Sequence, residues 1–133
     1  MNSNQNESPF GPVIFSYTRK QALADGIQVD VTDTAKEAGI KFPVFLTRTL
    51  YDACVAVPPG VTGQDVAGRL WDVLWMTRYA IQQAQPDADR ISVKLFVRND
   101  DRKPKLVKLV AVCGALDIDA PEPALTVLLP DED

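Results

Sequence analysis

The sequence predicts a single α+β domain in which an antiparallel sheet packs against one long helix and several shorter helices. Three observations support this class. The chain has 133 residues, the length of one ordinary domain. Residues 64–84 carry apolar side chains every three or four positions, as an amphipathic helix does. Consecutive strands follow this helix, so we expect a C-terminal three-stranded meander, together with strands from the N-terminal part.

The amino terminus is predicted to be a polar leader that precedes the domain. Residues 1–9 are rich in Asn and Ser and end in a proline, so we expect them to be disordered. The single domain then spans residues 10–133. Its first element is a short β-prone run, VIFSY at 13–17, which predicts a strand.

A helix and a strand are predicted next. Thr18 and Gln21 have the spacing of a capping box, which opens a helix that ends at Gly26. Residues 27–32 alternate apolar and polar side chains, a pattern typical of a strand with one buried face.

Two further short helices are predicted before the long one. The first covers about 32–38, with a cap at its start and a glycine after its end. Residues 42–46, FPVFL, do not distinguish helix from strand by periodicity, although the proline fits a first helical turn. The second helix runs from about 47 to 54, and the VPPG at 57–60 breaks the chain.

The helix at 64–84 is the strongest element of the sequence. Its apolar stripe is formed by Val66, Leu70, Val73, Leu74, Thr77, Ile81 and Ala84. Asp65, Arg69, Asp72 and Gln83 fall on the opposite face. We expect that face to be solvated, with ion pairs between Arg69 and the two aspartates, because these residues are three and four positions apart.

Three strands are predicted after this helix. Residues 91–98 alternate cleanly, and the polar segment 99–104 is typical of a hairpin loop. Residues 105–113 are apolar on both faces apart from one lysine, as in a central strand. A longer loop over 115–123 then leads to the last strand, at 124–129.

The composition excludes several function classes. There is no histidine, which removes the commonest general base and the usual zinc ligand. Cys54 and Cys113 lie far apart in apolar surroundings, so we expect two reduced core thiols; the alternatives are a disulfide or a reactive thiol. We therefore expect no cofactor, no metal and no catalytic residue of a familiar type.

The sequence also predicts a cytoplasmic protein without membrane contact. No apolar run approaches the roughly 18 residues that a membrane-spanning helix requires. The first residues contain neither the basic region nor the apolar core of a secretory signal.

Paired carboxylates are the remaining route to catalysis. Asp30 and Asp72 are the acids in the most apolar settings, and three tyrosines are available as proton donors: Tyr17, Tyr51 and Tyr79. Such acids can act together only if they face each other. Two D-x-D pairs, at 87–89 and 117–119, lack the remaining ligands of a calcium loop.

Three groups of residues are candidates for binding. Trp71 and Trp75, with Arg78 nearby, fit either core packing beneath the N-terminal segment or an exposed anchor for a protein partner. A basic hairpin offers the phosphate-contact candidates Arg98, Arg102, Lys103, Lys105 and Lys108. Asp100 and Asp101 neutralise its tip, so binding to nucleic acid is not expected.

The third group is the acidic end of the chain. Residues 111–133 carry six acids and no base, although the formal net charge of the whole chain is only −4. We expect Pro130 to direct Asp131, Glu132 and Asp133 outward. These carboxylates either attract a basic partner surface, as a row of phosphates would, or serve as a solubilising tail.

Several stretches resemble an uncharacterised family of short bacterial proteins carried largely on plasmids and other mobile elements. The stretches are FGPVIFSYTRKQALADGIQVDVT, AGIKFPVFLTRTLYDACVAVPPG, AGRLWDVLWM, VRND and LTVLLPDED, and they span Phe10 to Asp133. The family has no assigned activity, so the resemblance implies no catalytic residues. It implies the bacterial cytosol and a mobile element, where small accessory and anti-defence proteins are common.

The first hypothesis is therefore a non-enzymatic interaction protein of a mobile genetic element. Its partner would be a host-encoded or element-encoded protein, and its effect would be to inhibit or modulate a host nucleic-acid-handling or defence system. One alternative is a small histidine-free enzyme that uses Asp, Arg and Tyr side chains, such as a nucleotide-directed transferase. Another is a weak nucleic-acid binder that uses the hairpin at 98–108.

Overall fold

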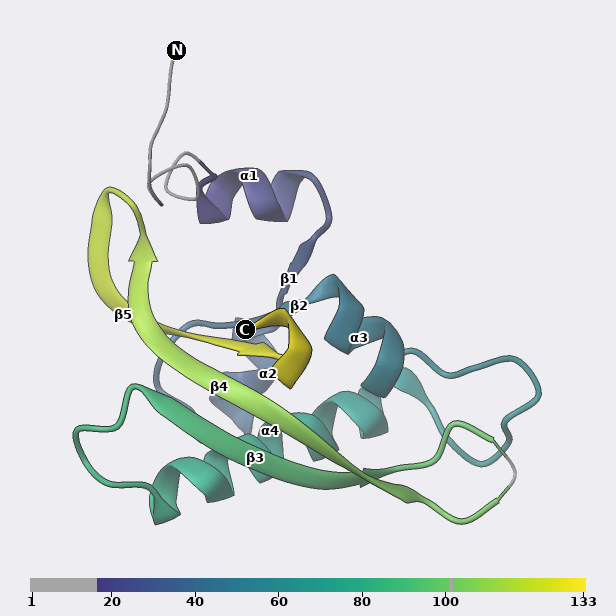
Figure 1. Ribbon diagram of the computed structural model, residues 1–133. Helices are drawn as coiled ribbons and strands as arrows, with labels where there is room; N and C mark the ends of the chain where they lie inside the picture. Colours follow the sequence, from purple (N-terminus) through teal and green to yellow (C-terminus); the bar gives the residue numbers. More distant parts are fainter. Residues whose placement is uncertain (1–16, 101) are drawn as a thin grey trace.

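The computed structural model describes residues 17–100 and 102–133 (Figure 1). The helices are α1 (Arg19–Ala24), α2 (Thr32–Glu37), α3 (Arg48–Cys54), α4 (Val66–Gln83) and the 3-10 helix η2 (Pro130–Glu132). The strands are β1 (Gln28–Asp30), β2 (Val44–Thr47), β3 (Arg90–Val97), β4 (Lys105–Asp117) and β5 (Ala120–Leu128). The predicted leader and nearly all of the strand predicted over 13–17 lie outside the described residues.

The five strands form one sheet in the order β1-β2-β5-β4-β3. The predicted α+β class is confirmed, and so is the long helix. The predicted antiparallel pairing holds for every neighbouring pair except β2 and β5, which are parallel, so the sheet is mixed. The undecided FPVFL segment provides β2, whose residues are apolar on both faces because both faces are covered.

The prediction of a loop over 115–123 is wrong for most of that segment. Most of it is strand, because β4 runs to Asp117 and β5 starts at Ala120. β5 contains two prolines, Pro121 and Pro123. They are accommodated because β2 pairs with β5 only from Leu125 onward, so that within residues 17–100 and 102–133 no strand lies on that side of β5 at the two prolines.

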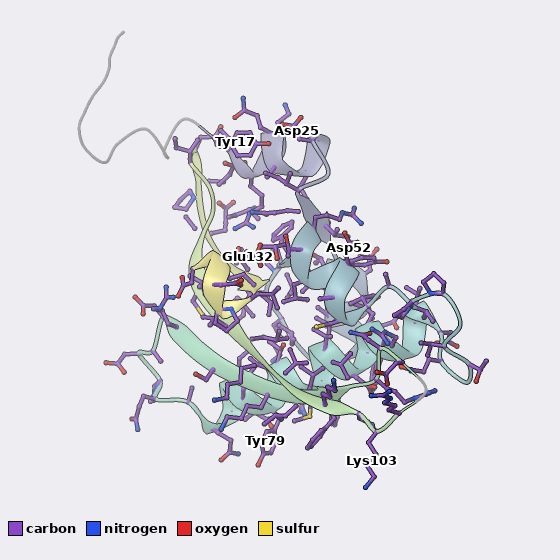
Figure 2. All side chains as sticks on the ribbon, turned by 45° about the vertical axis from the view of Figure 1, so that its right-hand side comes forward. Tyr17, Asp25, Asp52, Tyr79, Lys103 and Glu132 are labelled. Atoms are coloured by element: carbon purple, nitrogen blue, oxygen red, sulfur yellow. The ribbon has the colours of Figure 1, made fainter. Side chains whose placement is uncertain are left out.

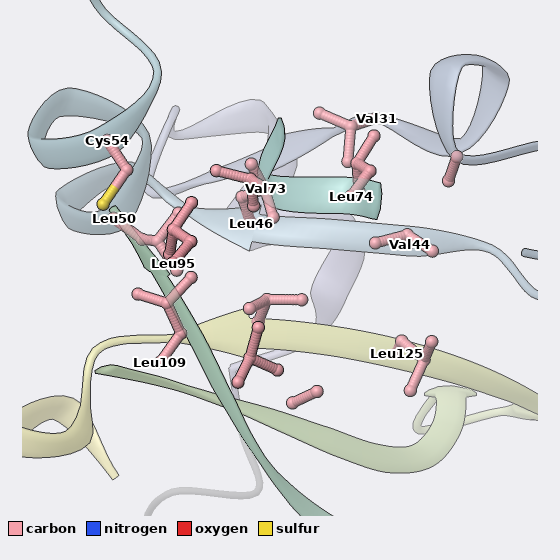
Figure 3. Packing of buried hydrophobic residues seen from close by; sticks show 14 of the residues in the cluster. Val31, Val44, Leu46, Leu50, Cys54, Val73, Leu74, Leu95, Leu109 and Leu125 are labelled. Carbon is pink, nitrogen blue, oxygen red and sulfur yellow. The ribbon is translucent and has the colours of Figure 1, made fainter. Parts of the chain in front are cut away.

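The core lies between α4 and one face of the sheet. In β3 the buried and exposed residues alternate along the whole strand, so one face of it packs on α4 while the other faces outward. Figure 3 shows the packed side chains of Leu46, Val73, Leu74, Leu95 and Leu109. These side chains are at most 5% exposed, so α4 buries the middle of its predicted apolar stripe against the sheet, whereas Val66 at the start of the stripe is 42% exposed.

The prediction of a solvated, ion-paired face on α4 is wrong for Arg69. Only 5% of this residue is exposed, and its guanidinium donates to the carbonyl oxygens of Cys54 at 3.1 Å and Arg98 at 2.8 Å. It also donates to the side chains of Gln64 and Asn99. Arg69 therefore ties α4 to the ends of α3 and β3, where unpaired chain-end carbonyls converge, a fact that helical periodicity does not contain.

Among the described residues, the other face of the sheet is covered over β2 and β5 but not over β3. There Arg19 of α1 places its guanidinium 4.1 Å from the centre of the Phe45 ring and donates to Thr126 at 3.0 Å. Burial lowers the pKa of Arg19, and the carboxylate of Asp117 acts against that shift. The α1 side of this outer face is thus closed, while no part of the chain that the structure describes covers its β3 side.

Candidate functional site

Exposed aromatic and apolar side chains gather where α4 runs beside β3, the edge strand of the sheet. We call this region the β3-edge surface. Its residues are Trp71, Trp75, Met76 and Tyr79 of α4, Arg90, Ser92, Lys94 and Phe96 of β3, and Leu106 of β4. Figure 2 labels Tyr79 at the rim of the molecule, on the side where α4 and β3 lie together.

Two stacked indoles form the most prominent feature of this surface. The ring centres of Trp71 and Trp75 lie 5.9 Å apart with an angle of 15° between the planes. Trp71 is 38% exposed and Trp75 is 45% exposed, so neither is a core residue. The guanidinium of Arg78 lies 5.0 Å from the Trp75 ring centre, a cation–π contact that fixes one end of the stack.

Gly39 explains how Arg78 reaches this position. The arginine passes so close to the loop after α2 that a Cβ atom at position 39 would lie 2.8 Å from its Nε. The φ angle of +95° at the same residue also favours glycine. The predicted group of Trp71, Trp75 and Arg78 is therefore brought together in space.

Two shallow hollows follow one another along β3. The first has a volume of about 500 Å³ and includes Tyr79, Ser92 and Lys94 in its lining. The second, of about 400 Å³, includes Trp75, Phe96 and Lys94. Both hollows have Lys94 and Met76 in their linings, so they are adjacent along the edge of the sheet, and together we call them the groove.

The outward face of β3 and β4 borders this groove and is partly apolar and partly basic. Phe96 pairs with Leu106, and these side chains are 66% and 51% exposed. At the next pair on the same face of the sheet, Lys94 lies directly opposite Lys108. Like charges in facing positions destabilise a sheet, so this pair favours a site for an anionic group.

The predicted phosphate-contact residues do not form one patch. Arg98 donates to the backbone oxygens of Thr62 and Asp100, and so holds the loop before α4. Lys105 and Lys108 are three residues apart on one strand, so they point to opposite faces of the sheet. Arg102 and Lys103 are exposed in the hairpin loop, and Figure 2 labels Lys103 at its tip.

The carboxylates at the end of the chain are largely used within the protein. Glu132 accepts hydrogen bonds from the Thr47 hydroxyl at 2.8 Å and the Leu129 N–H at 2.9 Å. Asp133 forms an ion pair with Arg90, at the start of β3. Asp131 is exposed in η2, so of these three acids it is the one whose carboxylate has no contact within the described residues.

The candidate catalytic acids are far apart in the sheet order. Asp30 lies on β1 at one edge and accepts from the N–H of Thr32, whereas Asp72 lies on α4 beside β3 at the other edge. They therefore do not form a pair. Tyr17 donates to Asp25 at 2.5 Å, near α1 (Figure 2).

Burial governs the chemistry of the two thiols. Cys54 is buried at the end of α3, and burial raises the pKa of its thiol. Cys113 is half-buried on β4, and burial raises the pKa of this thiol too. Residues 17–100 and 102–133 contain no cluster of three acids or cysteines able to hold a metal ion. Over the same ranges, every helix is too short or too polar to cross a membrane.

Sequence reasoning identified the tryptophans but missed the edge of β3. The signal was present, because in the alternation of 91–97 the outward positions carry Ser92 and Lys94 and then Phe96. A large aromatic side chain at an outward position of an amphipathic strand does not pack in the core. Its exposure therefore indicates a binding surface.

Comparisons with known proteins place the chain within one family. The family model described as "Family of unknown function (DUF6573)" matches residues 6–133. No curated protein matches the chain, and no solved structure does.

Proposed function

Since the chain belongs to the DUF6573 family, whose description assigns no function, we propose one from the geometry: the protein acts by binding another protein through its β3-edge surface. The observation that carries this proposal is the stacked, exposed pair of Trp71 and Trp75 beside the groove. Tryptophan, tyrosine and arginine are the side chains that contribute most to binding energy at protein interfaces.

The arrangement of this surface supports an anchor rather than scattered surface residues. The two indoles hold each other in place and Arg78 holds one of them, so little conformational freedom is left to lose on binding. Phe96 and Leu106 extend the apolar area onto the face of the sheet, and Lys94 and Lys108 form a polar border. An apolar centre with a charged rim is typical of protein interfaces.

A photo-crosslinking experiment tests the proposal. A benzophenone amino acid at position 75 is expected to form an adduct of one defined mass in living bacteria that carry the gene. The matched control places the same amino acid at position 118, an exposed apolar residue of the β4–β5 turn. Adducts of equal yield at both positions, or none at position 75, would contradict the proposal.

The biological setting is a finer part of the same proposal. The resemblance to proteins of plasmids and other mobile elements supports a bacterial cytoplasm as the compartment. It also supports a partner from a host nucleic-acid-handling or defence system, which the protein would inhibit or modulate without catalysis. The genes adjacent to this one test this setting, since defence or conjugation neighbours are expected and a purely metabolic neighbourhood would count against it.

One observation favours a second candidate function, binding of single-stranded nucleic acid. Phe96 is exposed on the outward face of the sheet beside Lys94 and Lys108, and an aromatic ring flanked by cations is a means of binding bases and phosphates. A fluorescent oligothymidine binding assay at several salt concentrations tests it. Binding that weakens steeply with salt and is lost in Lys94→Glu would support this function over protein binding.

A further inference from the structure

We propose that the β3-edge surface recognises its partner by strand addition: an extended segment with alternating acidic and apolar side chains pairs antiparallel with β3. This inference rests on the proposed function, since it names the part of the partner that is bound. It follows from three features of β3: the direction of its backbone groups, its length, and the chemistry on either side of it.

The backbone groups that face the open edge belong to alternate residues. The N–H of Cys113 donates to the carbonyl oxygen of Asp89 at 2.8 Å, so this pair is a hydrogen-bonded one. In an antiparallel ladder such pairs alternate, and the register is regular along β3. Ile91, Val93 and Leu95 therefore bond to β4, and the backbone groups of the even positions point away from it.

The free edge is long and has no neighbouring strand in the described part of the chain. The even positions are Arg90, Ser92, Lys94 and Phe96, and each offers an N–H and a C=O. Edge strands are usually blunted by short length, by charged side chains such as lysine, by proline or by a bulge. Of these devices, β3 carries the charged side chains of Arg90 and Lys94, which would attract an acidic segment. β1, at the opposite edge, has three residues, whereas β3 has eight, with no proline and no register shift.

The outward face selects acidic side chains. A residue of an added strand that lies opposite Lys94 would also lie near Lys108, the next residue across the sheet. A carboxylate there would attract Lys94 and so offset the repulsion between the two facing lysines. A residue of the added strand that lies opposite Phe96 would contact an exposed aromatic ring. A residue opposite Arg90 would face a guanidinium that already forms an ion pair with Asp133.

The helix side selects apolar side chains. Alternate residues of the added strand would point into the groove, whose lining includes Trp75, Met76 and Tyr79. Asp72 is the acid in that lining, so a second row of carboxylates is disfavoured there. Eight residues of strand extend over about 26 Å, so the recognised segment is about seven or eight residues long.

A peptide titration followed by NMR tests this mode of binding. The probe is a capped peptide of alternating glutamate and valine, about eight residues long to match β3. In the free protein the amides of Ser92 and Lys94 are expected to exchange quickly and those of Val93 and Leu95 slowly. Added peptide is expected to shift and protect the even amides, whereas a peptide of the same composition with glutamates and valines in two blocks is not.

Two matched variants separate backbone pairing from other contacts. Ser92→Pro removes an N–H that faces the open edge and that forms no hydrogen bond within the described ladder, so binding is expected to weaken at least about tenfold with the protein still folded. Ser92→Ala keeps that N–H and is expected to stay within about twofold. Lys94→Glu is expected to reject the glutamate peptide and to bind its lysine counterpart instead.

The outcomes distinguish this inference from the proposed function. If the crosslink at position 75 forms equally in wild type and Ser92→Pro, and the peptides leave the even amides unchanged, strand addition is overturned while protein binding stands. Protection of the even amides in the free, monomeric chain, or their concentration-dependent protection by a second copy, would also overturn it. So would an oligothymidine that shifts Lys94 and Phe96 when the glutamate peptide does not.

Discussion

Two phenylalanines on the same face of the sheet have opposite surroundings. Phe45 of β2 lies beneath the Arg19 guanidinium and is 4% exposed, whereas Phe96 of β3 is 66% exposed. Arg19 covers Phe45 and makes several hydrogen bonds to the sheet. Within the described residues, no side chain covers Phe96 in the same way. The part of the outer face around Phe45 therefore contributes to stability. The part around Phe96 is accessible for binding.

The strongest test of this comparison replaces the two rings in turn. Phe45→Ala removes a buried ring and is expected to lower the free energy of unfolding by about 3–5 kcal/mol. Phe96→Ala is expected to change it by less than about 0.5 kcal/mol, because the ring is mostly in water already. Urea unfolding measures both. Similar losses for the two variants would show that the outer face is not divided as described.

The second prediction concerns Arg69, the buried arginine that ties α4 to the ends of α3 and β3. Arg69→Met would leave the carbonyl oxygens of Cys54 and Arg98 buried without this donor, at a cost of roughly 2–4 kcal/mol. Arg102→Met is the matched control, since Arg102 is exposed in the hairpin loop and its side chain is expected to contribute less than about 0.5 kcal/mol. An equally mild effect at both positions would mean that water satisfies the carbonyls around Arg69.

Sequence patterns predicted the structure correctly where an element depends on its own residues alone. The alternation of 91–98 and the apolar stripe of 64–84 predicted β3 and α4 almost to the residue, because each follows from the period of its own backbone. The capping box of Thr18 and Gln21 is likewise local, and both of its hydrogen bonds are present.

The remaining features depend on partners that are distant in the sequence. The parallel pairing of β2 with β5 joins segments some eighty residues apart, so nothing in FPVFL alone reveals it. The burial of Arg69 depends on carbonyl groups at the ends of α3 and β3, which no side-chain pattern records. The same holds for Trp71 and Trp75, whose exposure depends on which elements pack beside them.

The third prediction is an increase in the free energy of unfolding, because the substitution removes a charge repulsion in the open half of the outer face. Lys94→Thr relieves the repulsion with Lys108 and is expected to raise the free energy of unfolding by about 0.2–1 kcal/mol. A double-mutant cycle with Lys108→Thr isolates the pair from the better strand propensity of threonine, and added salt should shrink the coupling. Lys103→Thr, in the hairpin loop, controls for net charge. A favourable coupling between the two lysines would remove the argument for an anionic group at this place.

The smallest expected effect is a pH dependence in the covered half, where Asp117 holds the start of α1. A hydrogen bond from the N–H of Ile118 lowers the pKa of the Asp117 carboxyl below its ordinary 3.8. The backbone N–H groups of Arg19 and Lys20 donate to the same carboxylate at 3.1 and 3.0 Å and lower the pKa further.

A lowered pKa in the folded state fixes the sign of this effect. The ionised carboxylate stabilises the fold fully above the ordinary pKa, and the contribution is lost as the pH falls through the lower value of the folded state. Asp117→Asn is therefore expected to be less stable than wild type at pH 7, and the difference should shrink below about pH 4. Asp119→Asn removes an exposed carboxylate from the same turn and controls for net charge. A difference that stays constant down to pH 3 would show that the carboxylate of Asp117 does not hold α1 through its charge, and would leave Arg19 alone to close the covered half.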